Sequence, residues 1–238
     1  MNGILIINKP AGPTSHDIVS AVRKKLDLKK VGHAGTLDPM ARGVLIVLVG
    51  KATKLSSMFL SSDKTYIAKI RLGMLTDTLD LAGTVKSVCD VPDLTEKRID
   101  NVLTGFEGEI LQLPPMYSAK KVKGKKLYEM ARKGIEVERN PEKVKIYEIK
   151  RLDYLKPDLT IKVSCSKGTY IRALAYDIGR VFGCNACIAD LKRVKSGKFS
   201  INEAIPFEKF KLMNRTEIEG SKYFLSKNNE NFENIKKS

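Results

Sequence analysis

A glycine-rich loop that leads directly into an apolar strand constrains the fold of this chain most. The loop, residues 32–43 (GHAGTLDPMARG), holds three glycines, one proline and one carboxylate, Asp38. The segment that follows, residues 44–49 (VLIVLV), is an uninterrupted apolar run, which indicates a buried strand. Pro39 keeps Asp38 out of a helix interior. The pattern therefore predicts a loop that presents Asp38 from a rigid support, although an Asp-Pro turn without a function would look the same.

The rest of the chain predicts further strands and helices. The alternation of residues that is typical of a half-buried strand is clearest in residues 64–72, where Tyr66, Ala68, Ile70 and Leu72 share one face. We expect further strands at 3–8, 44–49, 144–155 and 159–166, the last two antiparallel around the turn at 156–158. We expect helices at about 15–26, 52–60, 95–103, 127–133 and 169–182. Their N-caps would be Thr14 or Ser15 for the first helix, Thr95 for the third and Thr169 for the last.

The charge balance points to a polyanionic partner. The 238 residues include 43 Lys and Arg against 27 Asp and Glu, a formal net charge of +16. A surplus of this size favours nucleic acid, the commonest polyanion. Residues 120–126 (KKVKGKK) contain five lysines in seven positions. This run could be a solvated surface loop, or a patch in which Lys121, Lys123 and Lys125 contact RNA phosphates.

Neither a membrane nor a disulfide framework is expected. No segment reaches the roughly 18 apolar residues that span a bilayer, and the N-terminal residues do not resemble a signal peptide, so we expect a cytoplasmic protein. The cysteines should then be free thiols. Cys184 and Cys187 have the spacing of a metal or redox pair, but a zinc site needs a second pair of ligands that the sequence does not offer.

The usual cofactor motifs are missing from the sequence. It contains no GxGxxG after a strand, no GxxxxGK[ST] and no HExxH. A carboxylate such as Asp38 can act as a nucleophile or a base without a cofactor if a cation holds it in place. Arg172 lies at the start of the predicted helix 169–182, where the helix dipole disfavours a cation, so it needs an anionic partner. Asp38 is one candidate for that partner.

Six segments, in order along the chain, resemble the motifs of the TruB-type tRNA pseudouridine synthases. The loop at 32–43 resembles the catalytic motif of that family. The other five segments are NKPAGPTS at 8–15, KTY at 64–66, PMYSAK with GKKLY at 115–128, GTYIR at 168–172 and LKR at 191–193. The resemblance covers about residues 3–205, and six motifs in order are far more specific than one.

The resemblance implies a fold and a domain organisation. The fold would be α/β (α+β), the pseudouridine synthase fold, with a long mixed, largely antiparallel sheet, flanking helices and a central RNA-binding cleft. Residues 1–210 would form the catalytic domain, with a thumb-side basic insertion at about 106–140. Residues 211–238 would be a polar C-terminal tail, frayed from about Ser226, and the RNA-binding PUA domain of bacterial members would be absent or vestigial.

The resemblance also implies an activity, the isomerisation of uridine 55 in the T-arm of tRNA to pseudouridine. The base would be flipped out, and neither a cofactor nor a metal would be needed. Asp38 would take the place of the catalytic aspartate, Tyr66 would stack on the flipped uracil, and Arg172 would pair with Asp38. The expected substrate-binding residues are His33 in the space left by the flipped nucleotide, Tyr170 and Leu191 in the pocket wall, and Lys9, Lys121, Lys123 and Lys125. The loop glycines would let the backbone approach the nucleotide closely. The partner would be the T-arm of tRNA, bound by a monomer without an obligate protein partner.

Two other functions fit part of this pattern. The protein could be a tRNA-folding chaperone that opens the elbow without catalysis, or the catalytic subunit of a guide-RNA complex. Taken singly, Tyr66 and Tyr170 could be core residues and Arg172 a surface charge. The joint presence of Asp38, Tyr66 and Arg172 favours the enzyme.

Overall fold

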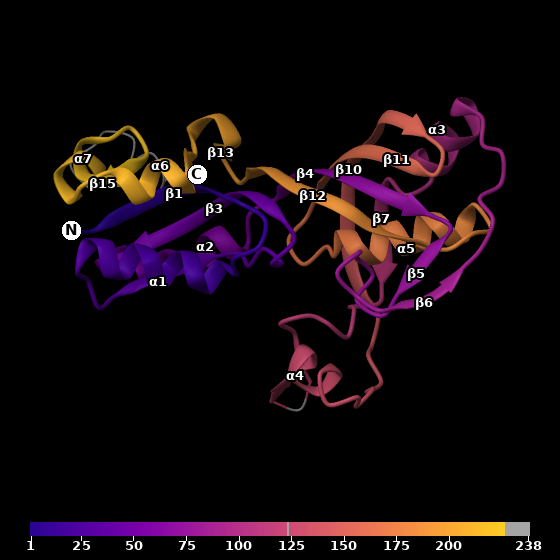
Figure 1. Ribbon diagram of the computed structural model, residues 1–238, viewed down its shortest axis with the longest axis horizontal. Helices are drawn as coiled ribbons and strands as arrows, with labels where there is room; N and C mark the ends of the chain where they lie inside the picture. The colour runs from indigo at the N-terminus through magenta and orange to yellow at the C-terminus, as the bar shows by residue number, and fades with distance from the viewer. Residues whose placement is uncertain (123, 227–238) are drawn as a thin grey trace. The chain divides into compact units, whose positions relative to one another are not determined.

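The computed structural model describes residues 1–122 and 124–226, which form two compact units. Unit 1 contains residues 1–66 and the C-terminal segment from Lys192, and unit 2 contains residues 67–191. Two strands carry the chain from one unit to the other, β4 (Lys64–Leu72) and β12 (Ala186–Ser196) (Figure 1). The sequence pattern predicts one domain over residues 1–210, and it does not show this division.

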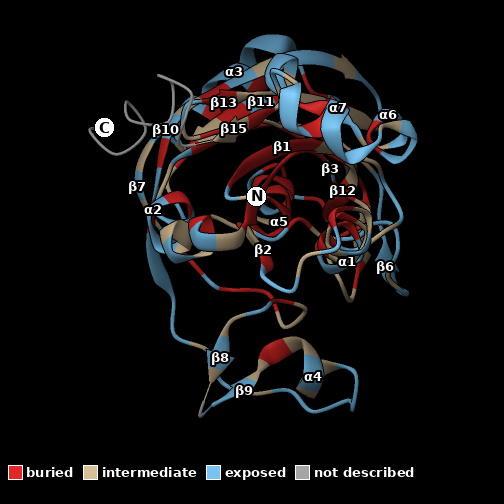
Figure 2. Cartoon of the chain, turned by 90° about the vertical axis from the view of Figure 1, so that its left-hand side faces the viewer, coloured by how far each residue is buried: buried red, intermediate tan, exposed pale blue. Residues whose placement is uncertain are grey.

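The sheet of unit 1 is built around two long apolar strands. The strand β1 (Gly3–Lys9) pairs antiparallel along its whole length with β3 (Arg42–Val49). The strand order is β14-β1-β3-β12, and β3 pairs in parallel with β12 at Lys192 and Arg193. Residues 43–49 of β3 are buried, and Figure 2 shows the same for β1, which explains why both strands lack the alternation of half-exposed strands.

Shorter elements complete unit 1. The 3-10 helix η1 (Gly50–Leu55) and α2 (Ser56–Leu60) replace the single helix predicted at 52–60. Other short strands are β2 (Val31–Ala34), which pairs with β3, β13 (Phe199–Ser200), which pairs with β12, and β14 (Ile205–Pro206), which pairs in parallel with β1. The strand β2 falls inside the segment predicted as a loop, because Val31 and Ala34 are buried against its neighbours while the residues between them are only half-buried.

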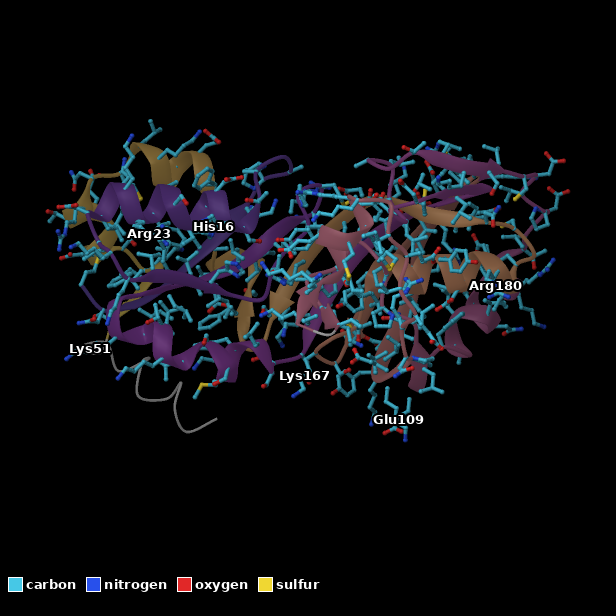
Figure 3. All side chains as sticks on the ribbon, turned by 90° about the horizontal axis from the view of Figure 1, so that it is seen from below. His16, Arg23, Lys51, Glu109, Lys167 and Arg180 are labelled. Carbon is cyan, nitrogen blue, oxygen red and sulfur yellow. The ribbon has the colours of Figure 1, made fainter. Side chains whose placement is uncertain are left out.

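The helix α1 (Ser15–Leu26) forms as its sequence predicts. Thr14 is the N-cap and shares a capping box with Asp17. One face, Ile18, Val19, Val22 and Leu26, is buried. The helix packs on β2 and carries His16 and Arg23 among its side chains (Figure 3).

The C-terminal segment adds two helices and a strand to unit 1. They are α6 (Phe207–Leu212), α7 (Arg215–Gly220) and β15 (Phe224–Ser226), and β15 pairs antiparallel with β1. The segment is predicted as a polar tail from residue 211, but Ile218 of α7 and Phe224 of β15 are buried, and β15 joins the sheet of unit 1. Residues 227–238, where the sequence predicts a frayed end, lie outside the described residues.

In unit 2 five strands follow the order β12-β4-β11-β10-β7. The strands β10 (Glu142–Leu155) and β11 (Asp158–Cys165) are antiparallel, as predicted, and β7 (Gly108–Gln112) pairs antiparallel with β10. The alternation predicted for β4 is confirmed, since Tyr66, Ala68, Ile70 and Leu72 are all buried. The helix α3 (Glu96–Thr104) contacts β10 and the helix α5 (Ile171–Val181).

Two further parts of unit 2 carry candidate site residues. A hairpin of β5 (Met74–Thr76) and β6 (Val85–Val88) encloses the acidic turn at 77–83. The predicted insertion contains β8 (Lys121–Val122), β9 (Lys125–Lys126) and α4 (Leu127–Ala131), and it projects from the sheet of this unit (Figure 1). Mixed, largely antiparallel pairing with helices packed on the strands confirms the predicted fold class.

One predicted N-cap is wrong. The sequence predicts Thr169 as the cap of α5, but the N-cap residue is Tyr170. The Thr169 hydroxyl donates instead to the Ser166 carbonyl at 3.0 Å, so it closes the turn that precedes the helix.

Candidate active site

Asp38 lies in a loop between two paired strands. The ladder of β2 and β3 ends at the pair Ala34 and Ile46, and the chain between them leaves the sheet. The Ala41 N–H donates to the Asp38 carbonyl at 3.0 Å, which closes a turn over Pro39. The loop therefore has a defined conformation, and Asp38 itself is half-buried.

Ser15 fixes the backbone immediately before Asp38. Its hydroxyl accepts from the Leu37 N–H at 2.9 Å and donates to the Leu37 carbonyl at 3.1 Å. Ser15 is the first residue of α1 and is 2% exposed. Both polar backbone groups of Leu37 are thus satisfied by one side chain that is itself held by a capped helix.

Lys9 fixes the backbone immediately after Asp38. Its Nζ donates to the Pro39 carbonyl at 3.1 Å and to the Pro10 carbonyl at 2.8 Å, and the Gly12 N–H also donates to Pro39 at 2.9 Å. Burial lowers the pKa of Lys9 to about 8, although the negative charge of Asp38 opposes that shift. Lys9 is fully buried, so these contacts support a role under the loop in place of the predicted RNA contact.

The structure places His33 in β2 and Tyr66 in β4. Tyr66 is 9% exposed. Burial lowers the pKa of His33, and the positive charge of Arg193 adds to the effect, so the neutral imidazole is favoured. Its buried Nδ1 has no hydrogen-bond partner among the described residues.

Arg172 is a buried residue of unit 2, not the surface charge that its sequence position could suggest. It is 4% exposed and lies in the first turn of α5. One terminal nitrogen donates to the Thr78 carbonyl at 2.6 Å and the other to the Tyr117 carbonyl at 2.7 Å. Its Nε lies 3.9 Å from Oδ2 of Asp80. The predicted pairing of Arg172 with Asp38 joins residues of the two units and stays a prediction.

Asp80, which the sequence does not single out, is a further candidate because it faces Arg172. It is 5% exposed, and its Oδ1 accepts from the Thr78 hydroxyl at 2.7 Å and from the Ala82 N–H at 3.0 Å. The sequence shows only an acidic turn, TDTLDLAG, with nothing to separate Asp80 from Asp77. The one sequence signal for a tight turn here is Gly83. In the structure a Cβ added to Gly83 would lie 2.2 Å from the Thr78 hydroxyl, so only glycine fits.

Tyr170 and Leu191 also belong to unit 2. The Tyr170 N–H donates to Oε1 of Gln112 at 2.7 Å, and burial raises the pKa of the Tyr170 hydroxyl. Gln112 is 1% exposed, so a buried amide fixes the start of α5. Leu191 is 5% exposed and lies in β12.

The basic insertion keeps its charges at the surface. Lys121 and Lys125 are exposed, whereas Lys123 lies outside the described residues. In the same insertion, Lys126 and Arg132 both lie over the Tyr128 ring, each 5.4 Å from its centroid. Exposed ammonium groups beside a cation-bound aromatic ring suit contact with a phosphate backbone.

The described residues offer no built metal site. Over 1–122 and 124–226 no group of three or more His, Cys, Asp and Glu side chains is placed to hold an ion. The cysteines Cys89, Cys165, Cys184 and Cys187 are free thiols, and burial raises the pKa of Cys187 to about 11. No helix in the described part of the chain is long and apolar enough to cross a membrane.

Comparison with known families gives two adjoining matches. Residues 23–171 match the TruB family pseudouridylate synthase N-terminal domain, and residues 172–225 match the tRNA pseudouridylate synthase B C-terminal domain. The second match continues past residue 210, where composition predicts the end of the catalytic domain.

Individual relatives agree with these matches. The chain is 48% identical over 208 residues to tRNA pseudouridine synthase B of Clostridium tetani, covering 87% of this chain and 72% of that protein. It is 43% identical over 219 residues to tRNA pseudouridine synthase B of Opitutus terrae, covering 92% and 91%. Among solved structures it is similar to a chain of a Cbf5-Nop10-Gar1 complex, with 33% identity and a TM-score of 0.70. That match covers 88% of this chain but only 53% of the other.

Proposed function

The chain belongs to the TruB family of pseudouridylate synthases, and on that premise we propose that it converts uridine 55 in the T-arm of tRNA to pseudouridine. The observation that carries the proposal is the set of hydrogen bonds around Asp38. Ser15 binds the backbone of Leu37 and Lys9 binds that of Pro39, so the backbone is fixed on either side of one carboxylate. Catalysis by a single carboxylate requires such fixed geometry.

The reaction is an isomerisation and needs no external reactant. The bond between C1′ and N1 breaks, the uracil turns, a bond forms between C1′ and C5, and the proton on C5 is lost as N1 gains one. Because the stacked uracil hides these atoms, the nucleotide must leave the stack at a cost of a few kcal/mol. Asp38 is the proposed nucleophile or base, and whether it attacks the sugar or the uracil is left open.

The remaining site residues have supporting roles in this proposal. Tyr66 stacks on the flipped uracil, and Tyr170 and Leu191 form walls of the pocket. His33 enters the space that the nucleotide leaves, which suits the neutral ring favoured by its lowered pKa. Arg172 pairs with Asp38, and Asp80 in turn holds the Arg172 side chain.

The RNA contacts are proposed to be electrostatic and to involve a single copy of the chain. Lys121, Lys123 and Lys125 contact phosphates of the T-arm, and the net charge of +16 favours association with tRNA. In this proposal no protein partner or metal is required, and the site of action is the cytoplasm.

The test is to incubate the protein with an unmodified tRNA transcript and to map pseudouridine by chemical modification. We expect one modified position, in the T-arm. Asp38→Asn should abolish the product while tRNA affinity stays within about a few-fold, because a carboxylate makes no favourable phosphate contact. Asp27→Asn is the matched control, since Asp27 is exposed in unit 1 and its φ of 50° is one that Asn tolerates.

Each outcome has a clear meaning. Product formation by Asp38→Asn would overturn the catalytic assignment. A wild-type protein that binds and refolds tRNA but leaves every uridine unmodified would favour the chaperone function instead.

A further inference from the structure

A buried arginine lies behind the Asp38 loop. Arg193, in the part of β12 that belongs to unit 1, is 1% exposed, and it is the largest fully buried side chain among the described residues. Its Nε donates to the Val44 carbonyl at 2.8 Å, and one terminal nitrogen donates to the Gly35 carbonyl at 2.9 Å. These two carbonyls lie at opposite ends of the segment that carries Asp38.

The two carbonyls lie where the ladder of β2 and β3 ends. The ladder of β2 and β3 runs from the pair Val31 and Val49 to the pair Ala34 and Ile46. Gly35 and Val44 come just beyond the last pair, where the strands separate. Gly35 lies outside the strands, and Val44 pairs with Asn8 of β1 but with no residue of β2, so no bond of the β2–β3 ladder serves these two carbonyls. The guanidinium of Arg193 therefore supplies the donors to these carbonyls just beyond the last pair of the ladder.

Two glycines of the loop lie next to Arg193. A Cβ on Gly35 would lie 3.4 Å from a terminal nitrogen of Arg193, and a Cβ on Gly43 would lie 2.2 Å from the Arg193 carbonyl oxygen. Both glycines have positive φ, 91° and 109°. The steric contact therefore requires glycine at position 43, and the positive φ favours glycine at both positions, where the sequence suggests close approach of a nucleotide.

Because Arg193 is charged, filling space does not explain why an arginine is buried at this position. Its positive charge contributes to the lowered pKa of both Lys9 and His33, so it lies among other basic groups. Burying a cation is costly, and an apolar side chain of similar volume would fill the space more cheaply. Its donors must therefore do something that an apolar residue could not.

We propose that Arg193 is a positioning residue for Asp38. By bridging the two ends of the loop, its guanidinium fixes the spacing between Gly35 and Val44 and so the direction in which Asp38 points. Ser15 and Lys9 bind other backbone groups of the loop, and together the three side chains bind the backbone at residues 35, 37, 39 and 44. The inference rests on the proposed function for the catalytic role of Asp38.

The experiment compares Arg193→Met, Arg193→Lys and a matched control in the same unit. Arg23→Met is the control, because Arg23 on α1 (labelled in Figure 3) also donates to a carbonyl, that of Val31 at 3.3 Å, but lies outside residues 35–44. Two quantities are measured on each protein. The first is hydrogen exchange at two loop amides, that of Leu37, which donates to the Ser15 hydroxyl, and that of Ala41, which donates to the Asp38 carbonyl. The second is kcat and KM for tRNA.

We expect Arg193→Met to lose about tenfold or more of the amide protection and to reduce kcat about 100-fold, with KM within about threefold, since a displacement of 1 Å costs about that factor. Arg193→Lys keeps the charge and some donors, so it should recover part of kcat. Arg23→Met should change neither the protection of these amides nor kcat. If Arg193→Met does not fold, the Arg193→Lys variant carries the test, with reduced protection and reduced kcat expected at unchanged KM.

The proposal would be overturned if the loop amides of Arg193→Met were as protected as in the wild type. It would also be overturned if the variant's kcat per folded enzyme were unchanged. If the wild type forms no pseudouridine, the proposed function fails. The exchange measurement still decides whether Arg193 holds the loop.

Discussion

Replacing Gly43 with Ala should destabilise unit 1 far more than replacing Gly12 with Ala, although the two glycines have almost the same backbone angle. Gly43 has a φ of 109° and Gly12 a φ of 106°. Around Gly12 no described atom lies within 4 Å of an added Cβ, whereas at Gly43 that Cβ would be 2.2 Å from the Arg193 carbonyl oxygen. The pair therefore separates the conformational cost of a side chain from the steric cost.

The expected magnitudes follow from these two terms. A non-glycine residue in an unfavourable backbone region costs about 1–3 kcal/mol, and both variants bear this cost. Overpacking adds about 1–3 kcal/mol at Gly43. The added cost stays high because the obstructing atoms are backbone atoms of Arg193, paired in register with Gly43, and cannot rotate away. We expect the free energies of unfolding of the two variants to differ by about 1–3 kcal/mol.

Urea unfolding followed by circular dichroism measures this difference. Both glycines lie in unit 1, so both variants report on the same part of the chain. In a protein of this size each kcal/mol also lowers Tm by about 2–4 °C. Equal destabilisation by Gly43→Ala and Gly12→Ala would refute the close approach of β12 to β3 at Arg193.

Three further perturbations test other parts of the site. Asp80→Asn keeps an oxygen acceptor for the neighbouring donors but removes the charge that faces Arg172. It should destabilise the protein by about 3 kcal/mol, near the low end for a broken buried ion pair. An unchanged Tm would contradict this. The pKa of Lys9, lowered from 10.5 to about 8, means that the unfolded chain binds more protons between these values. The wild type should therefore gain stability relative to Lys9→Met as the pH rises from 8 to 10.5, and a difference between the two proteins that does not vary with pH in denaturant titrations would show that Lys9 is not perturbed. Replacing both Lys121 and Lys125 with Gln should flatten the dependence of log Kd on log salt by roughly one unit for each phosphate that is no longer neutralised, and an unchanged slope would show that these lysines are only solvated.

Patterns short enough to lie within one element could be predicted from the sequence. The helix α1 follows from Thr14, Asp17 and an apolar stripe that are all within four turns, and its cap and buried face are as expected. The alternation of β4 and the continuous apolar run of β3 likewise specify strands of the two burial types. Pro39 alone keeps Asp38 out of a helix. These features depend on neighbours in the chain, so residue order is sufficient to determine them.

Failures occurred where a residue's role depends on a distant partner. Thr169 has the side chain of an N-cap, but its hydroxyl bonds backwards to Ser166. Lys9 lies in a family motif and is expected among the substrate-binding residues, and its burial with a bond to the Pro39 carbonyl, thirty residues away, could not be inferred from the sequence. Asp80 is one of two similar aspartates in a turn, and only the position of Arg172 beside it sets it apart.

The sequence by itself determined the family, because a family's motifs record residue types and their spacing, and it predicts from those motifs which residues carry the chemistry. Only the tertiary structure decided what holds those residues in place. The Asp38 loop is braced by Ser15, Lys9 and Arg193, and the bonds from Arg193 span 149 and 158 residues along the chain. Contacts over such separations exist only once the strands have paired, since Arg193 reaches the carbonyls of Gly35 and Val44 just beyond the end of the β2–β3 ladder.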